Sequence, residues 1–297
     1  MLRPVVVGLD GSRESLAAAD WAAREALRRD LPLRLVHALE GGMGPDESEL
    51  PELEAPRYWA RRILREAMDR LNERYPRLYL GADQVSRPAA DALVAAGDES
   101  ELLVLGSRAF SGIGGFMAGS VALATVAHVT RPVVLVRADQ TVADEHERDA
   151  EHRASARTPY RAVVVGVDPA SPAEELLGFA FESAALRAAP LRVVHAWQLG
   201  YVPRALEATA RKEARQAALR ALDAVLAPWQ ARFPSVEVRA LVEEGRPAQQ
   251  LLNATQDAGL LAVGRRIRPA RIGAHTGPVA HAVIHHARCP VAIVPHK

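Results

Sequence analysis

The sequence has almost no cysteine and no long apolar run. Cys289 is the only cysteine among 297 residues, so no disulfide can form within the chain, as is typical of proteins from reducing compartments. No stretch approaches the ~20 apolar residues of a membrane-spanning helix. The chain also enters a β-branched apolar segment at Val5, without the basic and apolar regions of a secretory leader. We therefore expect a cytoplasmic protein that has no membrane partner.

The common catalytic and cofactor motifs are absent as well. There is no glycine loop followed by Lys, no nucleophile elbow, no Ser–His–Asp arrangement and no paired carboxylates, so we assign no catalytic residue. Residues 159–297 carry 17 basic and 11 acidic residues, but the arginines are not interleaved with aromatic residues, so we expect no nucleic acid. His281 and His285 have i, i+4 spacing near Cys289 but no Cys-x-x-Cys or carboxylate companion, so we expect no metal site.

What the sequence does contain is one pattern that occurs twice, with an offset of 158 residues. The recurring pairs are Gly8 and Gly166, Asp10 and Asp168, His37 and His195, Gly106 and Gly264, Gly119 and Gly277, and Pro132 and Pro290. Each copy is long enough to bury a core of its own, which indicates a duplicated domain. We predict domains at 1–138 and 159–297. The charged segment 139–158 between them has almost no large apolar residues, which predicts a linker.

Each half alternates short apolar segments with amphipathic ones. In the first half we expect strands near residues 4–10, 31–39, 78–85, 101–106 and 132–137, and helices at 15–29 (with Ser12 as N-cap), 57–75, 88–98 and 120–129. The second half repeats this order. Five strands that alternate with four helices predict an α/β fold with a five-stranded parallel sheet in each domain, doubly wound and Rossmann-like. Ligands of such sheets bind beyond the carboxyl ends of the strands.

The glycine-rich loop 106–120 is the best candidate for chemistry. Gly106 ends the fourth predicted strand, and Gly119 and Ser120 open the next helix. A helix N-terminus presents unpaired N–H groups to an anion, while Ser120 adds a hydroxyl and Arg108 a positive charge. These residues fit a phosphate site. They fit a flexible glycine loop capped by serine equally well, because short glycine motifs are common by chance.

Three motifs together resemble the universal stress protein family: VVVGLDGS at 5–12, LVHA at 35–38, and the glycines of 106–120 before the helix. The resemblance covers both halves and implies a tandem member of the family. In its nucleotide-binding branch, ATP is held by the pattern G-x2-G-x9-G-[ST]. The resemblance then implies that Asp10 contacts the adenine or ribose, and that the backbone of Ala38 lines the adenine pocket. The residues expected to bind ATP, with or without magnesium, are Gly8, Asp10, Ala38, Gly106, Arg108, Gly119, Ser120 and Val121.

The two loops depart from the family pattern to different extents. In the first loop Ala109 stands where the family has its second glycine, which penalises a left-handed backbone by ~1 kcal/mol or more. In the second loop Ile267 takes that place, and Pro278 replaces the serine or threonine, removing one N–H and the hydroxyl. We therefore expect at most one nucleotide per chain, in the first domain. The second loop is cationic, through Arg265, Arg266, Arg268, Arg271 and His275, so another anion is an alternative there.

Three functions follow, and the sequence leaves all of them open. The leading one is an ATP-binding regulatory protein of the stress response that acts on an unidentified protein partner. The second is slow ATP hydrolysis or self-phosphorylation, for which Ser120 is the candidate acceptor. The third is an interaction protein that binds no nucleotide, which Ala109 and the changes in the second loop support. Family resemblance also implies pairing through the last strands, as an internal pseudo-dimer or between copies in a homo-oligomer.

Overall fold

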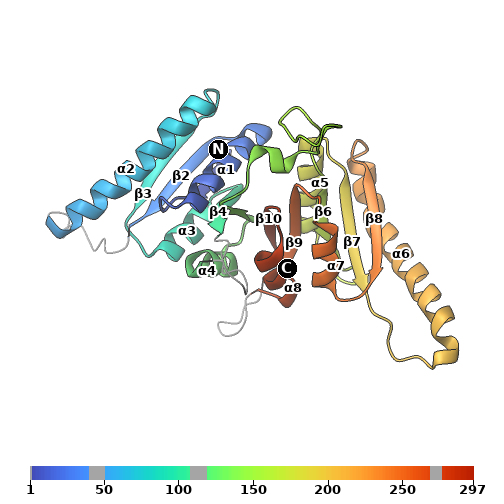
Figure 1. Cartoon of the computed structure of the whole chain (residues 1–297). Helices are drawn as coiled ribbons and strands as arrows, with labels where there is room; N and C mark the ends of the chain where they lie inside the picture. Colours follow the sequence, from blue (N-terminus) through green and yellow to red (C-terminus); the bar gives the residue numbers. More distant parts are fainter. Residues whose placement is uncertain (1, 40–50, 108–118, 268–275) are drawn as a thin grey trace. The chain divides into compact units, whose positions relative to one another are not determined.

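The computed structural model describes residues 2–39, 51–107, 119–267 and 276–297. The chain divides into two compact units, Met1–Thr141 and Val142–Lys297 (Figure 1). In the described residues no helix is both long enough and apolar enough to cross a membrane.

The first unit alternates strands and helices along the chain. Its elements are β1 (Val5–Gly8), α1 (Arg13–Arg29), β2 (Leu33–Ala38), α2 (Pro51–Arg74), β3 (Leu80–Val85), α3 (Ala89–Asp98), β4 (Leu102–Ser107), α4 (Ser120–His128) and β5 (Val133–Arg137). Its strands lie in the order β3-β2-β1-β4-β5, and the pairings β1–β2, β1–β4, β2–β3 and β4–β5 are all parallel. Helices α1 and α2 cover one face of the sheet, and α3 and α4 cover the other.

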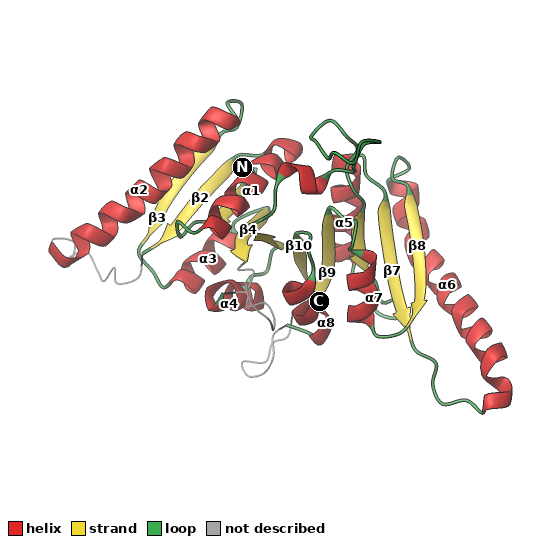
Figure 2. Ribbon diagram, in the orientation of Figure 1, coloured by secondary structure: helices red, strands yellow, loops and turns green. Residues whose placement is uncertain are grey.

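The second unit repeats this arrangement (Figure 2). Its elements are η2 (Val142–Glu145), β6 (Val163–Gly166), α5 (Glu174–Arg187), β7 (Leu191–Trp197), η3 (Arg204–Leu206), α6 (Glu207–Arg232), β8 (Val238–Glu244), α7 (Pro247–Ala254), β9 (Leu260–Arg266), α8 (Pro278–His286) and β10 (Val291–His296). The strand order is β10-β9-β6-β7-β8, again with parallel pairings. The expected α/β fold with two doubly wound halves is confirmed.

Strand and helix composition explains the layers. The central strand β1 is buried along its whole length, as its continuous β-branched sequence predicts for a strand covered on both faces. Helix α1 begins after Ser12, whose hydroxyl accepts a hydrogen bond from the Ser15 N–H at 3.2 Å. Its buried side is rich in alanine, with Ala18 and Ala22 fully buried. Small side chains there let the helix lie close to the sheet.

The two units differ at the start of the helix that follows the first strand. By the offset of 158, the start of α1 at Arg13 corresponds to Ser171, but α5 begins three residues later, at Glu174. Pro169 and Pro172 occupy this stretch, and proline restricts both its own backbone and that of the residue before it. Most of one helical turn present in the first unit is therefore missing in the second.

Part of the segment expected to be a linker folds onto the second unit. Residues 142–145 form the short helix η2, and Glu145 and His146 are buried. The Arg161 N–H donates to the Glu145 carbonyl oxygen at 2.9 Å, and the Arg161 Nε–H donates to the His146 carbonyl oxygen at 2.7 Å. The His146 ring lies 4.1 Å from that of Tyr160. Backbone pairing and one ring contact thus order a segment that has few large apolar residues.

Candidate ligand sites at the carboxyl ends of the strands

Each sheet has a point where the winding of the chain reverses, between β1 and β4 in the first unit and between β6 and β9 in the second. Open α/β sheets bind ligands beyond the strand ends at such a point. A cavity lies there in both units. Its volume is about 230 Å³ in the first unit and about 520 Å³ in the second. The larger cavity therefore belongs to the unit with the less typical glycine loop.

The first cavity brings together residues from segments that are far apart in the sequence. Seven of the eight residues expected from the sequence line it: Gly8, Asp10, Ala38, Gly106, Gly119, Ser120 and Val121. The eighth, Arg108, lies outside the described residues, as does Ala109. The wall is completed mainly by apolar side chains, among them Val36, Leu93 and Leu105.

The carboxylate of Asp10 is held at the start of α1. Its Oδ1 accepts hydrogen bonds from the Ser12 N–H at 2.9 Å and from the Ser12 hydroxyl at 2.5 Å. The Asp10 side chain is nonetheless exposed at the cavity. Asp10 therefore has the turn-forming role that is common for this residue type, and its place in the wall also lets it face a ligand.

The two histidines at the strand ends are tied to the backbone. His37 Nδ1 lies 2.7 Å from the Leu9 carbonyl oxygen, and His195 Nδ1 lies 3.1 Å from the Val167 carbonyl oxygen. Because a carbonyl oxygen only accepts hydrogen bonds, Nδ1 carries the proton in each ring. These contacts fix the tautomer and the orientation of both rings.

The glycines of the first cavity have different physical roles. A Cβ on Gly106 would lie 2.5 Å from the carbonyl carbon of Glu14 and 2.7 Å from the backbone nitrogen of Ser15, and a Cβ on Gly8 would lie 2.8 Å from side-chain carbons of neighbouring leucines. Gly106 and Gly8 thus permit close packing inside the protein. A Cβ on Gly119 would meet no atom of the described residues within 4 Å, so Gly119 leaves space open among them. The sequence pattern alone did not separate these roles.

Helix α4 presents its N-terminus to the first cavity. The Leu123 N–H donates to the Gly119 carbonyl oxygen at 3.0 Å, so the N–H groups of Ser120, Val121 and Ala122 have no partner within the helix. Among the described residues, no side chain caps this end. The start of α4 therefore presents to the cavity three N–H groups, the hydroxyl of Ser120 and the positive end of the helix dipole. This arrangement is suited to an anion.

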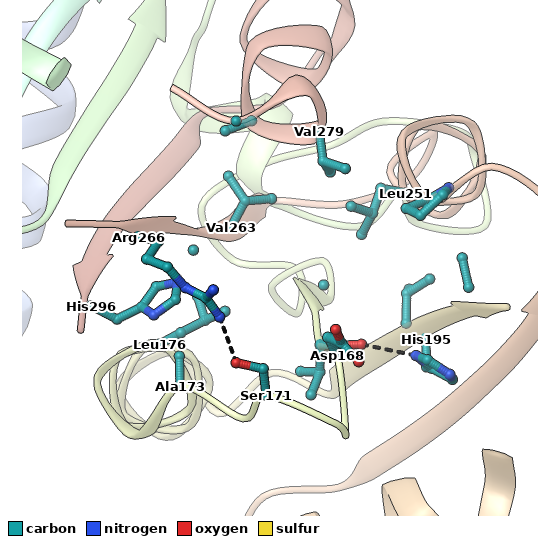
Figure 3. A pocket seen from close by; sticks show the side chains of 18 of the residues that line it. Asp168, Ser171, Ala173, Leu176, His195, Leu251, Val263, Arg266, Val279 and His296 are labelled. Atoms are coloured by element: carbon teal, nitrogen blue, oxygen red, sulfur yellow. Dashed lines mark hydrogen bonds between the residues drawn. The ribbon is translucent and has the colours of Figure 1, made fainter. Parts of the chain in front are cut away.

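The second cavity carries charged residues at its rim (Figure 3). Arg266 and His296 are register partners at the ends of β9 and β10, and Arg266 Nη2 donates to the Ser171 hydroxyl oxygen at 2.7 Å. Figure 3 shows Arg266 beside His296, with His195 toward the other end. Arg266 was recognised in the sequence as part of a cationic loop. His296 was missed, although the offset of 158 aligns it with Ala138 and so marks it as a difference.

Helix α8 offers fewer donors to the second cavity than α4 offers to the first. Its first residue is Pro278, which has no N–H. The His281 N–H donates to the Gly277 carbonyl oxygen at 2.9 Å, which leaves the N–H groups of Val279 and Ala280. There is no hydroxyl at the place of Ser120. Of the other cations expected near this loop, Arg268, Arg271 and His275 lie outside the described residues.

The histidines of α8 do not gather into a metal centre in the described residues. The rings of His281 and His285 meet edge to face with centroids 4.4 Å apart. Across the described part of the chain, no group of three or more His, Cys, Asp or Glu residues is arranged to hold a metal ion. Cys289 is buried and reduced, as expected for a small apolar residue beside a strand.

Comparisons with known proteins agree with this geometry. A model of the universal stress protein family matches residues 1–137 and again 159–295. A universal stress protein of Mycobacterium tuberculosis is 31% identical over 97% of this chain and 96% of its own, and one of Mycolicibacterium smegmatis is 30% identical over 98% and 96%. The crystal structure of a universal stress protein from Archaeoglobus fulgidus has the same fold, with a TM-score of 0.69 and 15% identity over 99% of this chain and 98% of that one. The chain belongs to the universal stress protein family, with two family domains in tandem.

Proposed function

We propose that the first unit binds an adenine nucleotide, ATP by preference, and that the protein is a nucleotide-responsive regulator of the stress response. The observation that carries this proposal is the convergence of seven expected residues from β1, β2, β4 and α4 on one cavity that ends in a free helix N-terminus. An unidentified protein partner would respond to the bound nucleotide. The single, buried Cys289 fits a role in the reducing cytoplasm.

In this proposal each end of the nucleotide would lie against a different part of the cavity. The phosphates would accept hydrogen bonds from the first N–H groups of α4 and from the Ser120 hydroxyl. The adenosine would lie toward Asp10 and Ala38 at the ends of β1 and β2. Small-molecule sites usually measure about 300–1,000 Å³, so a nucleotide would extend beyond the 230 Å³ enclosed here. Arg108, next to β4, remains a candidate phosphate ligand from the sequence.

The test compares how much ATP raises the melting temperature of matched variants of the full chain. Gly119→Val fills the open space at the end of α4, and Gly277→Val makes the same change at the matching place in the second unit. Neither new Cβ meets an atom within 4 Å in the part of the chain that the structure describes, so both variants should fold. We expect Gly119→Val to abolish the ATP-induced shift and Gly277→Val to leave it unchanged.

Ser120→Ala and Asp10→Ala extend the same test to the two ends of the nucleotide. Loss of the hydroxyl should weaken ATP binding by roughly tenfold to a hundredfold, since a hydrogen bond to a charged group contributes about 1.5–3 kcal/mol. Because Asp10 also holds the start of α1, its variant is judged by the ATP-induced shift and not by its melting temperature. An unchanged shift in Gly119→Val, Ser120→Ala and Asp10→Ala together would refute the site assignment.

A further inference from the structure

The second cavity is larger because the chain closes less tightly around it. In the first unit the backbone of Glu14 and Ser15 lies against Gly106. The matching residues in the second unit are Pro172 and Ala173, which precede the late start of α5. There, a Cβ on Gly264 would meet the His296 ring at 2.8 Å and a Leu176 side chain at 3.4 Å, with no helix backbone among its nearest neighbours. The lost helical turn thus opens space at the switch point of the sheet.

The walls of this space are apolar and the rim is charged. The apolar part of the lining consists of Val167, Leu176, Leu177, Val194, Leu251, Val263 and Val279. At one end are Arg266 and His296, adjacent on β9 and β10, and at the other are Asp168 and His195, at the ends of β6 and β7. A volume of about 520 Å³ lies within the usual range of small-molecule sites. Such walls suit a ligand with an apolar body.

The charged end suits one acidic group better than a chain of phosphates. Arg266 has five N–H donors in a planar fork that matches a carboxylate, and Ser171 accepts one of them at 2.7 Å, which fixes the direction of the fork. His296 lies beside it. A polyphosphate would need more donors from α8, where Pro278 supplies neither an N–H nor a hydroxyl and only the N–H groups of Val279 and Ala280 remain.

We propose that the second unit binds a small organic acid, with its carboxylate on Arg266, beside His296, and its apolar body between α5, α7 and the strand ends. The site is distinct from the nucleotide site of the first unit, and the proposal does not depend on that site. The tandem chain would then respond to two chemically different ligands, one in each unit.

The experiment is an isothermal titration of the full chain with hexanoate, octanoate and decanoate, and with octan-1-ol as the uncharged control. We expect one saturable site for at least one of the acids and much weaker binding of the alcohol. Arg266→Gln keeps a polar side chain at an exposed position, so folding should be retained, and it should weaken acid binding by about tenfold or more. Gly277→Val should abolish acid binding by filling the cavity.

Matched variants separate this proposal from the nucleotide proposal. Gly119→Val should leave acid binding unchanged while it removes the effect of ATP. The absence of saturable acid binding would overturn the inference, as would equal binding of octanoate and octan-1-ol. Displacement of the acid by ATP in the Gly119→Val variant would show instead that the second cavity is a nucleotide site.

Discussion

Replacing Gly106 with alanine should destabilise the first unit far more than the same change destabilises the second. The new Cβ would lie 2.5 Å from the carbonyl carbon of Glu14 and 2.7 Å from the nitrogen of Ser15. Both atoms are backbone at the start of α1, so the helix itself must move. Overpacking typically costs about 1–3 kcal/mol, and a contact with backbone belongs at the upper end of that range.

The repeat supplies a matched control at Gly264. There the new Cβ would meet the end of the His296 ring at 2.8 Å, and a side chain at the rim of a cavity can rotate away. We expect a cost of roughly 1 kcal/mol or less for Gly264→Ala and roughly 3 kcal/mol for Gly106→Ala. For a unit of this size the larger loss lowers the melting temperature by roughly 10 °C.

Differential scanning calorimetry of the two variants and the unaltered chain measures both effects, with Gly119→Ala as a second control. Within residues 2–39, 51–107, 119–267 and 276–297, a Cβ on Gly119 meets nothing within 4 Å, so the melting temperature of Gly119→Ala should stay within the range of neutral surface changes. Equal melting temperatures for Gly106→Ala and Gly264→Ala would refute the reasoning, because they would mean that helix α1 does not close on β4 as described.

Three further changes test the packing and electrostatics of the units. Phe181→Ala should cost about 3–5 kcal/mol in urea denaturation, since Phe181 is fully buried and its ring stacks on Trp229 at 5.8 Å; a loss below 1 kcal/mol would contradict this. Glu25→Gln should lower the free energy of unfolding by a similar amount, about 3–5 kcal/mol, because the buried carboxylate pairs with two arginines of α1 at 2.8 Å. An unchanged denaturation midpoint would be inconsistent with that pairing. A hydrogen bond from Arg192 lowers the pKa of Asp257 in the folded protein, so the stabilisation is present above the unfolded pKa of about 3.9 and lost as the pH falls through the folded value. Asp257→Asn should therefore cost roughly 0.5 kcal/mol at neutral pH and nothing in strong acid, and a difference that persists in acid would argue against the pair.

Local sequence patterns predicted most of the fold because the elements are defined by local signals. The β-branched segment at β1, the Ser12 cap and the repeated glycines each specify a strand, a helix start or a turn over a few residues. The parallel sheet then follows from their alternation. Seven residues that line the first cavity were also predicted, partly because they end strands or begin a helix at one edge of the sheet and partly, as for Asp10 and Ala38, from the family resemblance.

What the sequence did not predict depends on contacts between distant segments. The packing role of Gly106 becomes visible only when α1 lies against the end of β4. The folding of residues 142–158 depends on backbone pairing with residues near Arg161. Pro169 and Pro172 were present as signals for the late start of α5, but the size of the resulting cavity depends on how α5, β9 and β10 approach each other.

The stoichiometry of ATP binding tests the central claim most directly. Isothermal titration of the full chain with ATP should give one site, which is lost in Gly119→Val and kept in Gly277→Val, because the donors at Ser120 are complete only in the first unit. Two equal sites, or a single site that is lost in Gly277→Val and kept in Gly119→Val, would contradict the assignment of the nucleotide to the first unit.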